Sequence, residues 1–222
     1  MKVLLLGATG LIGSSLLNLL LSDSGISQII VLSRRDLPIQ DSRLSVHNLE
    51  ISEATKEHFD SVDSVFSCLG TTIKKAGSRE KFREVDFDLV YSTAKYAEEK
   101  SVKQFHMVSS LGADPNSPIF YSRVKGEIEE ELKKMKIPSV LIFQPSLLIG
   151  ERQEVRMGEK FGEYLGYILS PIFWGPIRKY KPISADRVAQ AMYWTSKQPQ
   201  NGVAIYESDR IYDISIRFAK GR

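Results

Sequence analysis

Apolar residues along the chain fall into short continuous runs, and longer segments of mixed polarity separate these runs. Buried parallel strands show continuous apolar runs of this kind, and helices cover both faces of such a sheet. The predicted strands are residues 3–6, 28–32, 44–47, 64–68, 104–108 and 139–143, and the predicted helices are 11–21, 53–58, 78–100 and 119–136. The alternation predicts an α/β fold with a doubly wound parallel sheet of the Rossmann type.

The pattern changes in the last third of the chain. We expect helices over 157–169 and 185–197 and a last strand over 203–207. A length of 222 residues suits one domain. We therefore expect a single domain over 1–222, with a dinucleotide-binding core in 1–150 and a small pocket-forming part in 151–222. The aromatic segment 164–174 is expected to pack in the core, with a lid over an apolar substrate as the alternative.

A glycine-rich turn connects the first predicted strand to the first predicted helix. Gly7, Gly10 and Gly13 are spaced three apart. Glycine permits positive φ and a close approach of phosphate to the backbone, while the following helix offers free N–H groups. Strand, glycine turn and helix together are the context that a dinucleotide fingerprint requires. The predicted cofactor contacts in this turn are Gly7, Thr9, Gly10, Leu11 and Ile12.

The end of the second predicted strand indicates which dinucleotide binds. In this fold an acidic residue here favours NAD, and arginine accommodates the 2′-phosphate of NADP. The chain has Ser33, Arg34 and Arg35 at this place, and all three are predicted contacts of NADP(H). We interpret the nearby Asp36 as part of a turn. The alternative is that both arginines are solvated surface charges.

A second motif suggests proton transfer. Tyr121 and Lys125 are four residues apart in a predicted helix and so share one face. A neighbouring ammonium favours the phenolate and makes a tyrosine useful in acid–base catalysis. Upstream, a predicted strand ends at Ser109 and Ser110, either of which could bind a substrate oxygen; we select Ser110. Alone, such a pair is more often a surface tyrosine beside a solvated lysine.

Composition excludes several classes of protein. A formal net charge of +3 gives no indication of nucleic-acid binding, and no apolar stretch suits a membrane helix. Three glycines interrupt the apolar N-terminal run, so we expect no signal peptide. The single cysteine excludes an internal disulfide, and we expect a cytoplasmic protein without membrane contact. The three histidines lack the spacing of metal ligands, and we predict no metal site.

Charged residues are frequent near the end of the predicted helix 119–136. Glu129 and Lys133 are four residues apart, as are Glu130 and Lys134. We expect a solvated helix face with weak ion pairs here.

These motifs together resemble those of an extended or atypical short-chain dehydrogenase/reductase, and most of all the Tat-interacting-protein-like branch. The resemblance rests on residues 7–13, 33–35, 68–72, 85–86, 108–114, 121–127 and 144–150. It implies NADP(H) binding, with Ser110 as hydroxyl partner, Tyr121 as acid–base and Lys125 as its activator. It also implies that Cys68, Leu69, Gly70 and Thr71 pass the two riboses, and that Pro145, Ser146 and Leu147 flank the nicotinamide.

The chain departs from this family pattern at two positions. Asp86 stands where extended members often have asparagine. The aspartate either argues against a proton relay through this position or makes the relaying group an acid. Gln144 stands where arginine is more usual.

The expected function is an NADP(H)-dependent oxidoreductase acting on a small-molecule carbonyl or alcohol. The alternative is an NADP(H)-binding regulatory or scaffold protein, with a homodimer or a protein partner as further options. Epimerase or dehydratase chemistry on a sugar nucleotide is less favoured, because the last third of the chain is short.

Overall fold

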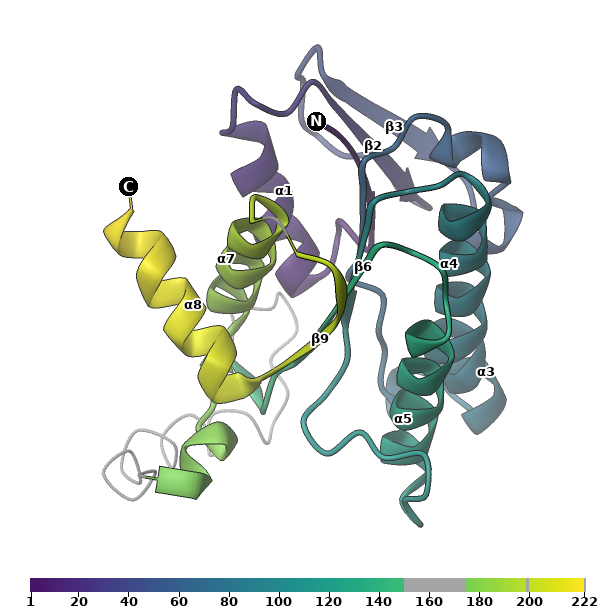
Figure 1. Ribbon diagram of the computed structural model, residues 1–222. Coiled ribbons are helices and arrows are strands. Elements are labelled where there is room, and N and C mark those ends of the chain that lie inside the picture. Colours follow the sequence, from purple (N-terminus) through teal and green to yellow (C-terminus); the bar gives the residue numbers. More distant parts are fainter. Residues whose placement is uncertain (150–174, 199, 222) are drawn as a thin grey trace.

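In the computed structural model, which describes residues 1–149, 175–198 and 200–221, a parallel seven-stranded sheet forms the centre of the molecule (Figure 1). Its strand order is β3-β2-β1-β4-β5-β6-β9. The strands are β1 Lys2–Leu6, β2 Gln28–Ser33, β3 Leu44–Asn48, β4 Ser64–Ser67, β5 Gln104–Val108, β6 Ser139–Gln144 and β9 Gly202–Glu207. A separate two-stranded pair joins β7 Leu148–Ile149 to β8 Ile183–Ser184. The expected doubly wound α/β fold is confirmed.

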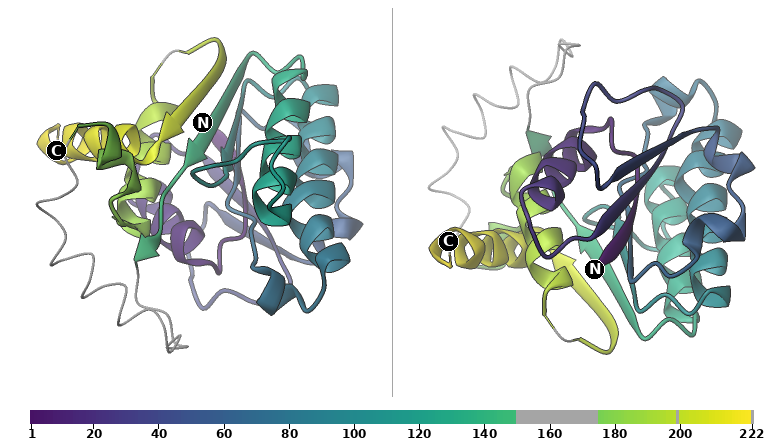
Figure 2. Two further views of the ribbon diagram at one scale, coloured as in Figure 1. Left: turned by 90° about the horizontal axis from the view of Figure 1, so that it is seen from below. Right: turned by 90° about the horizontal axis from the view of Figure 1, so that it is seen from above.

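Helices cover the sheet on both faces (Figure 2). On one face lie α1 Leu11–Leu21, α7 Ala185–Ser196 and α8 Ser208–Lys220, and on the other lie α4 Leu89–Glu99 and α5 Phe120–Lys133. Alternate side chains of each strand enter opposite cores: Val3 and Leu5 belong to the first, and Leu4 and Leu6 to the second. All four of these side chains are fully buried.

The helices differ from the sequence prediction in three places. The expected helix 53–58 is two short 3₁₀ turns, η1 Ile51–Glu53 and η2 Lys56–Phe59, because so short a segment cannot offset the cost of helix nucleation. The expected helix 78–100 is interrupted: α3 Arg79–Arg83 and α4 are separated by one π-helical turn, η3 Glu84–Asp88. The final helix, α8, was not predicted. The remaining helical pieces are α2 Ile73–Ala76 and the 3₁₀ turn η5 Gly175–Tyr180.

The last part of the chain completes the sheet. The expected strand 203–207 is β9, which runs parallel to β6 along its whole length. Helix α7 packs on α1, and α8 packs on α7. The expected helix 157–169 and the aromatic segment 164–174 lie outside the described residues.

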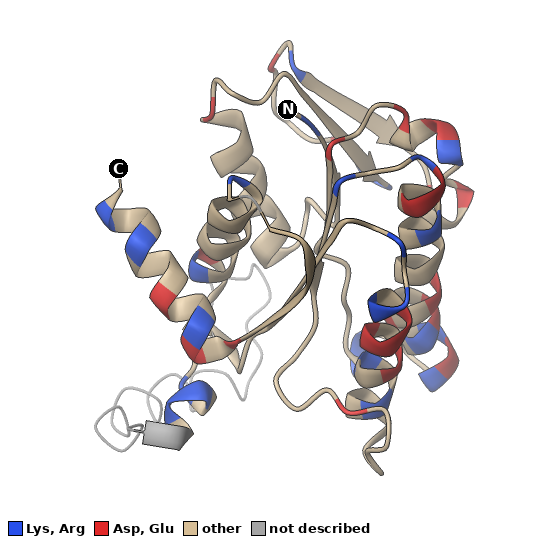
Figure 3. Ribbon diagram, viewed as in Figure 1, with Lys and Arg blue, Asp and Glu red and all other residues tan. Residues whose placement is uncertain are grey.

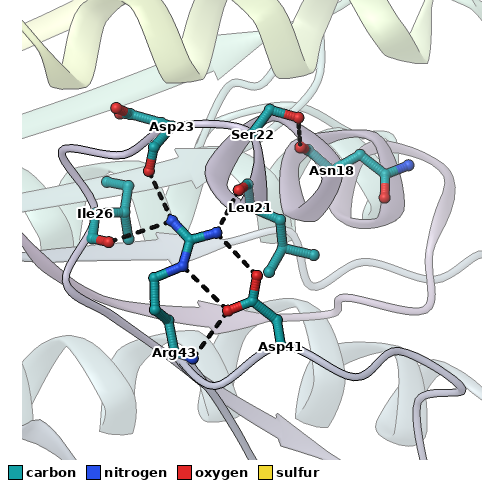
Figure 4. A network of polar contacts seen from close by, with 7 residues as sticks. All are labelled: Asn18, Leu21, Ser22, Asp23, Ile26, Asp41 and Arg43. Atoms are coloured by element: carbon teal, nitrogen blue, oxygen red, sulfur yellow. Dashed lines mark hydrogen bonds and ion pairs between the residues drawn. The ribbon is translucent and has the colours of Figure 1, made fainter.

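Arg43 links three segments at the amino-terminal side of β3 (Figure 4). Its guanidinium donates to both carboxylate oxygens of Asp41 and to the backbone carbonyls of Leu21, Asp23 and Ile26. The hydrogen bonds from Arg43 hold the pKa of Asp41 below its usual value. The end of α1, the loop before β2 and the start of β3 are thereby held together.

Charge is distributed mainly over the outward helix surfaces and the strand ends, while the strands themselves are mostly uncharged (Figure 3). None of the helices within the described ranges is long and apolar enough to cross a bilayer. Three charged residues on or beside α5, described below, are buried exceptions.

Candidate functional site

The three glycines after β1 serve different purposes. Gly7 has φ of +78°, and a Cβ there would lie 2.6 Å from the carbonyl oxygen of Cys68. A Cβ on Gly13 would lie 2.1 Å from the carbonyl oxygen of Gly7. Packing therefore requires glycine at both positions. Gly10 is exposed, and its Cβ would meet one atom, the Gly7 oxygen, at 3.3 Å. The turn is thus open to a ligand at Gly10.

The first turn of α1 suits an anion. Gly10 caps the helix without any side-chain hydrogen bond, and no acidic residue lies in the first turn. The helix N–H groups and the positive end of the helix dipole are thus left for a ligand. Thr9 is exposed and Leu11 is half-buried, whereas Ile12 packs in the core and can offer only its backbone. This arrangement fits the pyrophosphate of a dinucleotide.

Both arginines after β2 are exposed. The Arg34 Nε atom lies 3.9 Å from Glu50, and both side chains are more than half exposed, so the pair is weak and solvent-screened. The Ser33 hydroxyl accepts a hydrogen bond from the Arg35 backbone N–H at 3.2 Å. Asp36 accepts a hydrogen bond from the side chain of Asn48, the last residue of β3.

The loop after β4 lies beside the glycine turn. Burial raises the pKa of the Cys68 thiol to about 12, which favours a small apolar residue over a reactive thiol. Leu69 packs in the core below the loop, and Gly70 is exposed. The Thr71 backbone N–H donates to the Asp86 carboxylate at 2.9 Å, which fixes the loop to the π-helical turn.

Lys125 and Asp86 form a buried ion pair. The ammonium nitrogen lies 2.6 Å from Asp86 Oδ1, and the two side chains are 4% and 0% exposed. The same nitrogen lies 3.5 Å from the carbonyl oxygen of Val108, at the end of β5. A Cβ built on Gly70 would lie 3.9 Å from it. Lys125 therefore sits directly beneath the β4 loop. The π-helical turn places Asp86 in the core, and such turns occur often at functional sites.

The charge of Lys125 is stabilised by its neighbours. Burial lowers the pKa of Lys125, but interactions with Asp86, Tyr121 and Glu129 outweigh burial and raise the pKa above its usual value. Tyr121 lies in the first turn of α5, is half-buried and packs against Phe82, with ring centroids 5.3 Å apart. Tyr121 and Lys125 lie one helical turn apart on α5, and Tyr121 is among the groups that favour the charged form of Lys125.

The two serines after β5 have different surroundings. The Ser109 hydroxyl donates to the Glu129 carboxylate. The Ser110 hydroxyl is buried and has no hydrogen-bond partner among the described residues. Of the two hydroxyls, only that of Ser110 lacks a partner among the described residues.

The expected solvated face at the end of α5 is wrong for Glu129. This residue is 3% exposed, and Gln144 Nε2 donates to both of its carboxylate oxygens at 2.9 Å. Lys133 instead pairs with Glu130 three residues earlier, and Lys134 pairs with Glu131. The spacing Tyr121, Lys125, Glu129 places all three on one helix face, which was the signal available in the sequence.

Hydrogen bonds within the protein hold the segment after β6 in place. Pro145 is buried, and its carbonyl accepts a hydrogen bond from the Leu111 N–H at 2.9 Å. The Ser146 hydroxyl bonds to the Lys181 carbonyl and lies 2.9 Å from the Ser208 hydroxyl. Leu147 is 58% exposed and free to contact a ligand. Among the described residues, no three His, Cys, Asp or Glu side chains gather where they could hold a metal ion.

Comparisons with known proteins identify the family of this chain. A family model described as NAD(P)H-binding matches residues 7–161. The mitochondrial protein FMP52 of Candida albicans is 36% identical over 173 residues, covering 75% of this chain and 76% of that protein. Protein HTATIP2 of Rattus norvegicus is 36% identical over 163 residues, covering 71% and 67%. The resemblance to the Tat-interacting-protein-like branch is thereby confirmed.

A similar solved structure is the UDP-glucuronic acid 4-epimerase of Bacillus cereus in complex with UDP-glucuronic acid and NAD. The TM-score is 0.70 at 15% identity, over 93% of this chain and 77% of that one. At this identity the likeness shows the Rossmann-type fold alone.

The comparisons also correct one expectation. Several relatives are named mitochondrial FMP52 proteins, so the expected cytoplasmic location is wrong. A single cysteine excludes an internal disulfide but does not distinguish between compartments without disulfides. The family match and the glycine turn agree: this chain belongs to the NAD(P)H-binding family of Rossmann-type proteins, with FMP52 and HTATIP2 among its relatives.

Proposed function

We propose that this chain is an NADP(H)-dependent oxidoreductase of the short-chain dehydrogenase/reductase type, which interconverts a carbonyl and an alcohol through Ser110, Tyr121 and Lys125. One observation carries the proposal. The buried Lys125 ammonium lies beneath the β4 loop, one helical turn after Tyr121. A charge is costly to bury, and here it is kept at the end of the sheet where Rossmann-type proteins bind dinucleotides.

Each side chain has a separate role in this mechanism. When bound, NADPH supplies a hydride to the carbonyl carbon. The Tyr121 phenol donates its proton to the oxygen that gains negative charge, and the Lys125 ammonium stabilises the phenolate that results. The Ser110 hydroxyl donates a hydrogen bond to the same oxygen. A buried hydroxyl without a partner is unfavourable, and this bond would satisfy it.

Asp86 holds the lysine in place. Its carboxylate connects Lys125 to the backbone of Thr71, so the catalytic helix and the β4 loop are fixed relative to each other. The carboxylate also makes the buried pair neutral as a whole, which lowers the cost of burying the ammonium.

The choice of NADP(H) over NAD(H) rests on Arg34 and Arg35. A guanidinium recognises phosphate through two parallel hydrogen bonds. Arg34 has only a weak ion pair to give up in order to do so.

The mechanism is tested by Tyr121→Phe, with Tyr91→Phe as the control that removes a phenol hydroxyl from α4 on the same face of the sheet. NADPH oxidation is followed against a panel of aldehydes and ketones, and NADPH affinity is measured by calorimetry. We expect Tyr121→Phe to abolish turnover without weakening NADPH binding, while Tyr91→Phe behaves as wild type. Wild-type turnover in Tyr121→Phe would refute the mechanism. NADPH binding without turnover of any substrate, together with a stoichiometric partner protein, would support the regulatory alternative.

A further inference from the structure

Glu129 is a buried carboxylate that the proposed mechanism does not use. It is 3% exposed and lies one helical turn after Lys125 on α5. Its direct hydrogen-bond partners are two neutral donors, the Ser109 hydroxyl and the Gln144 amide. In the part of the chain that the structure describes, it forms no ion pair.

The two donors belong to the two segments that border the site. Ser109 directly precedes Ser110 at the end of β5, and Gln144 is the last residue of β6, directly before Pro145. The Ser109 N–H also donates to the Phe143 carbonyl at 2.7 Å. One carboxylate therefore joins both strand ends to the helix that carries Tyr121 and Lys125.

Burial makes an ionised carboxylate costly at this place. Burial raises the pKa of Glu129, against the opposing effects of Ser109, Gln144, Lys133 and Lys125. The folded protein thus carries a cost for the ionised form that a neutral glutamine would avoid. An ionised Glu129 differs from glutamine in two respects: both of its oxygens accept the hydrogen bonds of Ser109 and Gln144, and its negative charge acts on Lys125.

Resting on the proposed function above, we propose that Glu129 is a positioning residue of this site. Its carboxylate fixes Ser109 and Gln144, and thereby the place of the Ser110 hydroxyl, and its charge acts on the Tyr121–Lys125 pair. The charged groups that act on it are Lys133 and Lys125 on α5, and Lys125 is itself paired with Asp86 on the π-helical turn.

The charge is tested without a substrate. Absorbance at 295 nm follows the ionisation of all nine tyrosines of the chain at once. Subtracting the absorbance curve of Tyr121→Phe leaves the titration of Tyr121. We expect Glu129→Gln to titrate Tyr121 at a lower pH than wild type, because removal of a negative charge stabilises the phenolate. The control is Glu130→Gln, which removes a partly exposed carboxylate from the next position and should leave Tyr121 unchanged.

Placement is tested by turnover. In Glu129→Gln and in Ser109→Ala we expect kcat to fall about tenfold, because small displacements of a catalytic group lower the rate steeply. We expect NADPH affinity to change less than about threefold, since neither residue is a proposed cofactor contact. Ser109→Ala keeps the charge and should leave the Tyr121 titration unchanged.

The outcomes separate this proposal from the proposed function. If both folded variants keep wild-type kcat and Glu129→Gln keeps the wild-type Tyr121 titration, Glu129 is only structural and the inference is overturned. If Tyr121→Phe itself keeps full turnover, the proposed function fails. In that case the titration of Tyr121 in Glu129→Gln still tests whether the charge of Glu129 acts on the Tyr121–Lys125 pair. A titration equal to that of wild type then overturns the inference.

Discussion

His106 should make the protein sensitive to acid. It is fully buried on β5, stacked between Phe66 and Phe143 with ring centroids 4.5 Å and 6.1 Å away. Burial lowers the pKa of His106 from 6.5 to about 3. The unfolded chain therefore binds a proton that the folded protein does not bind until the pH is far lower. The resulting stability is complete above pH 6.5 and is lost as the pH falls from 6.5 toward 3.

The magnitude follows from the two pKa values. Each pH unit below the unfolded pKa costs about 1.4 kcal/mol, so lowering the pH from 7 to 4 should cost about 3 kcal/mol through His106 alone. Urea unfolding of wild type and His106→Phe at both pH values measures this loss, with other titrating groups common to both proteins. His106→Leu gives the same comparison if the larger ring does not fit.

We expect the pH-dependent loss to be about 3 kcal/mol smaller in His106→Phe than in wild type. His58→Asn removes a partly exposed histidine and should keep the wild-type loss. An equal loss in wild type and His106→Phe would refute the reasoning, because the buried ring would then be protonated as readily as in the unfolded chain.

Three further predictions concern the site. Gly13→Ala should lower the free energy of unfolding by more than about 3 kcal/mol, because its Cβ would lie 2.1 Å from the Gly7 oxygen. Gly10→Ala should cost about 1 kcal/mol in urea unfolding but weaken NADPH binding at least about tenfold by calorimetry; unchanged affinity would place the nucleotide elsewhere. Asp86→Asn should lower the free energy of unfolding by about 3 kcal/mol, because it leaves the buried Lys125 ammonium unpaired. Asp86→Asn/Lys125→Met should lose less free energy of unfolding than the sum of the losses in the two single variants. A loss equal to that sum would show that the two residues are not coupled.

The sheet could be predicted because its signal is local. A continuous apolar run between polar segments identifies a buried parallel strand, and all seven predicted strands are found within one residue of their expected ends. The glycine turn was equally readable, because a strand, three spaced glycines and a helix stand next to one another in the sequence. Helix α8 was missed although Ile211, Ile214 and Phe218 recur at the three-to-four-residue spacing of an amphipathic helix, so its signal was also present in the sequence.

The surroundings of the site depend on contacts between distant segments. A glutamate four residues before a lysine indicates a solvated ion pair, and Glu129 has that spacing to Lys133 yet is buried against Ser109 and Gln144. Similarly, nothing in residues 84–88 signals the π-helical turn that carries Asp86 to Lys125. Such contacts form where β5, β6 and α5 pack together, and no local sequence pattern predicts that packing.

The central claim, that this chain uses NADP(H), is tested most directly by calorimetric titration with NADPH and with NADH. The proteins compared are wild type, Arg34→Ala/Arg35→Ala, and Lys133→Ala/Lys134→Ala, which removes the same charge from the C-terminal end of α5. The account predicts that wild type and the lysine variant bind NADPH at least about tenfold more tightly than NADH, and that the arginine variant loses this preference while its NADH affinity is unchanged. Equal affinity of wild type for both nucleotides, or an unchanged preference in the arginine variant, would contradict it.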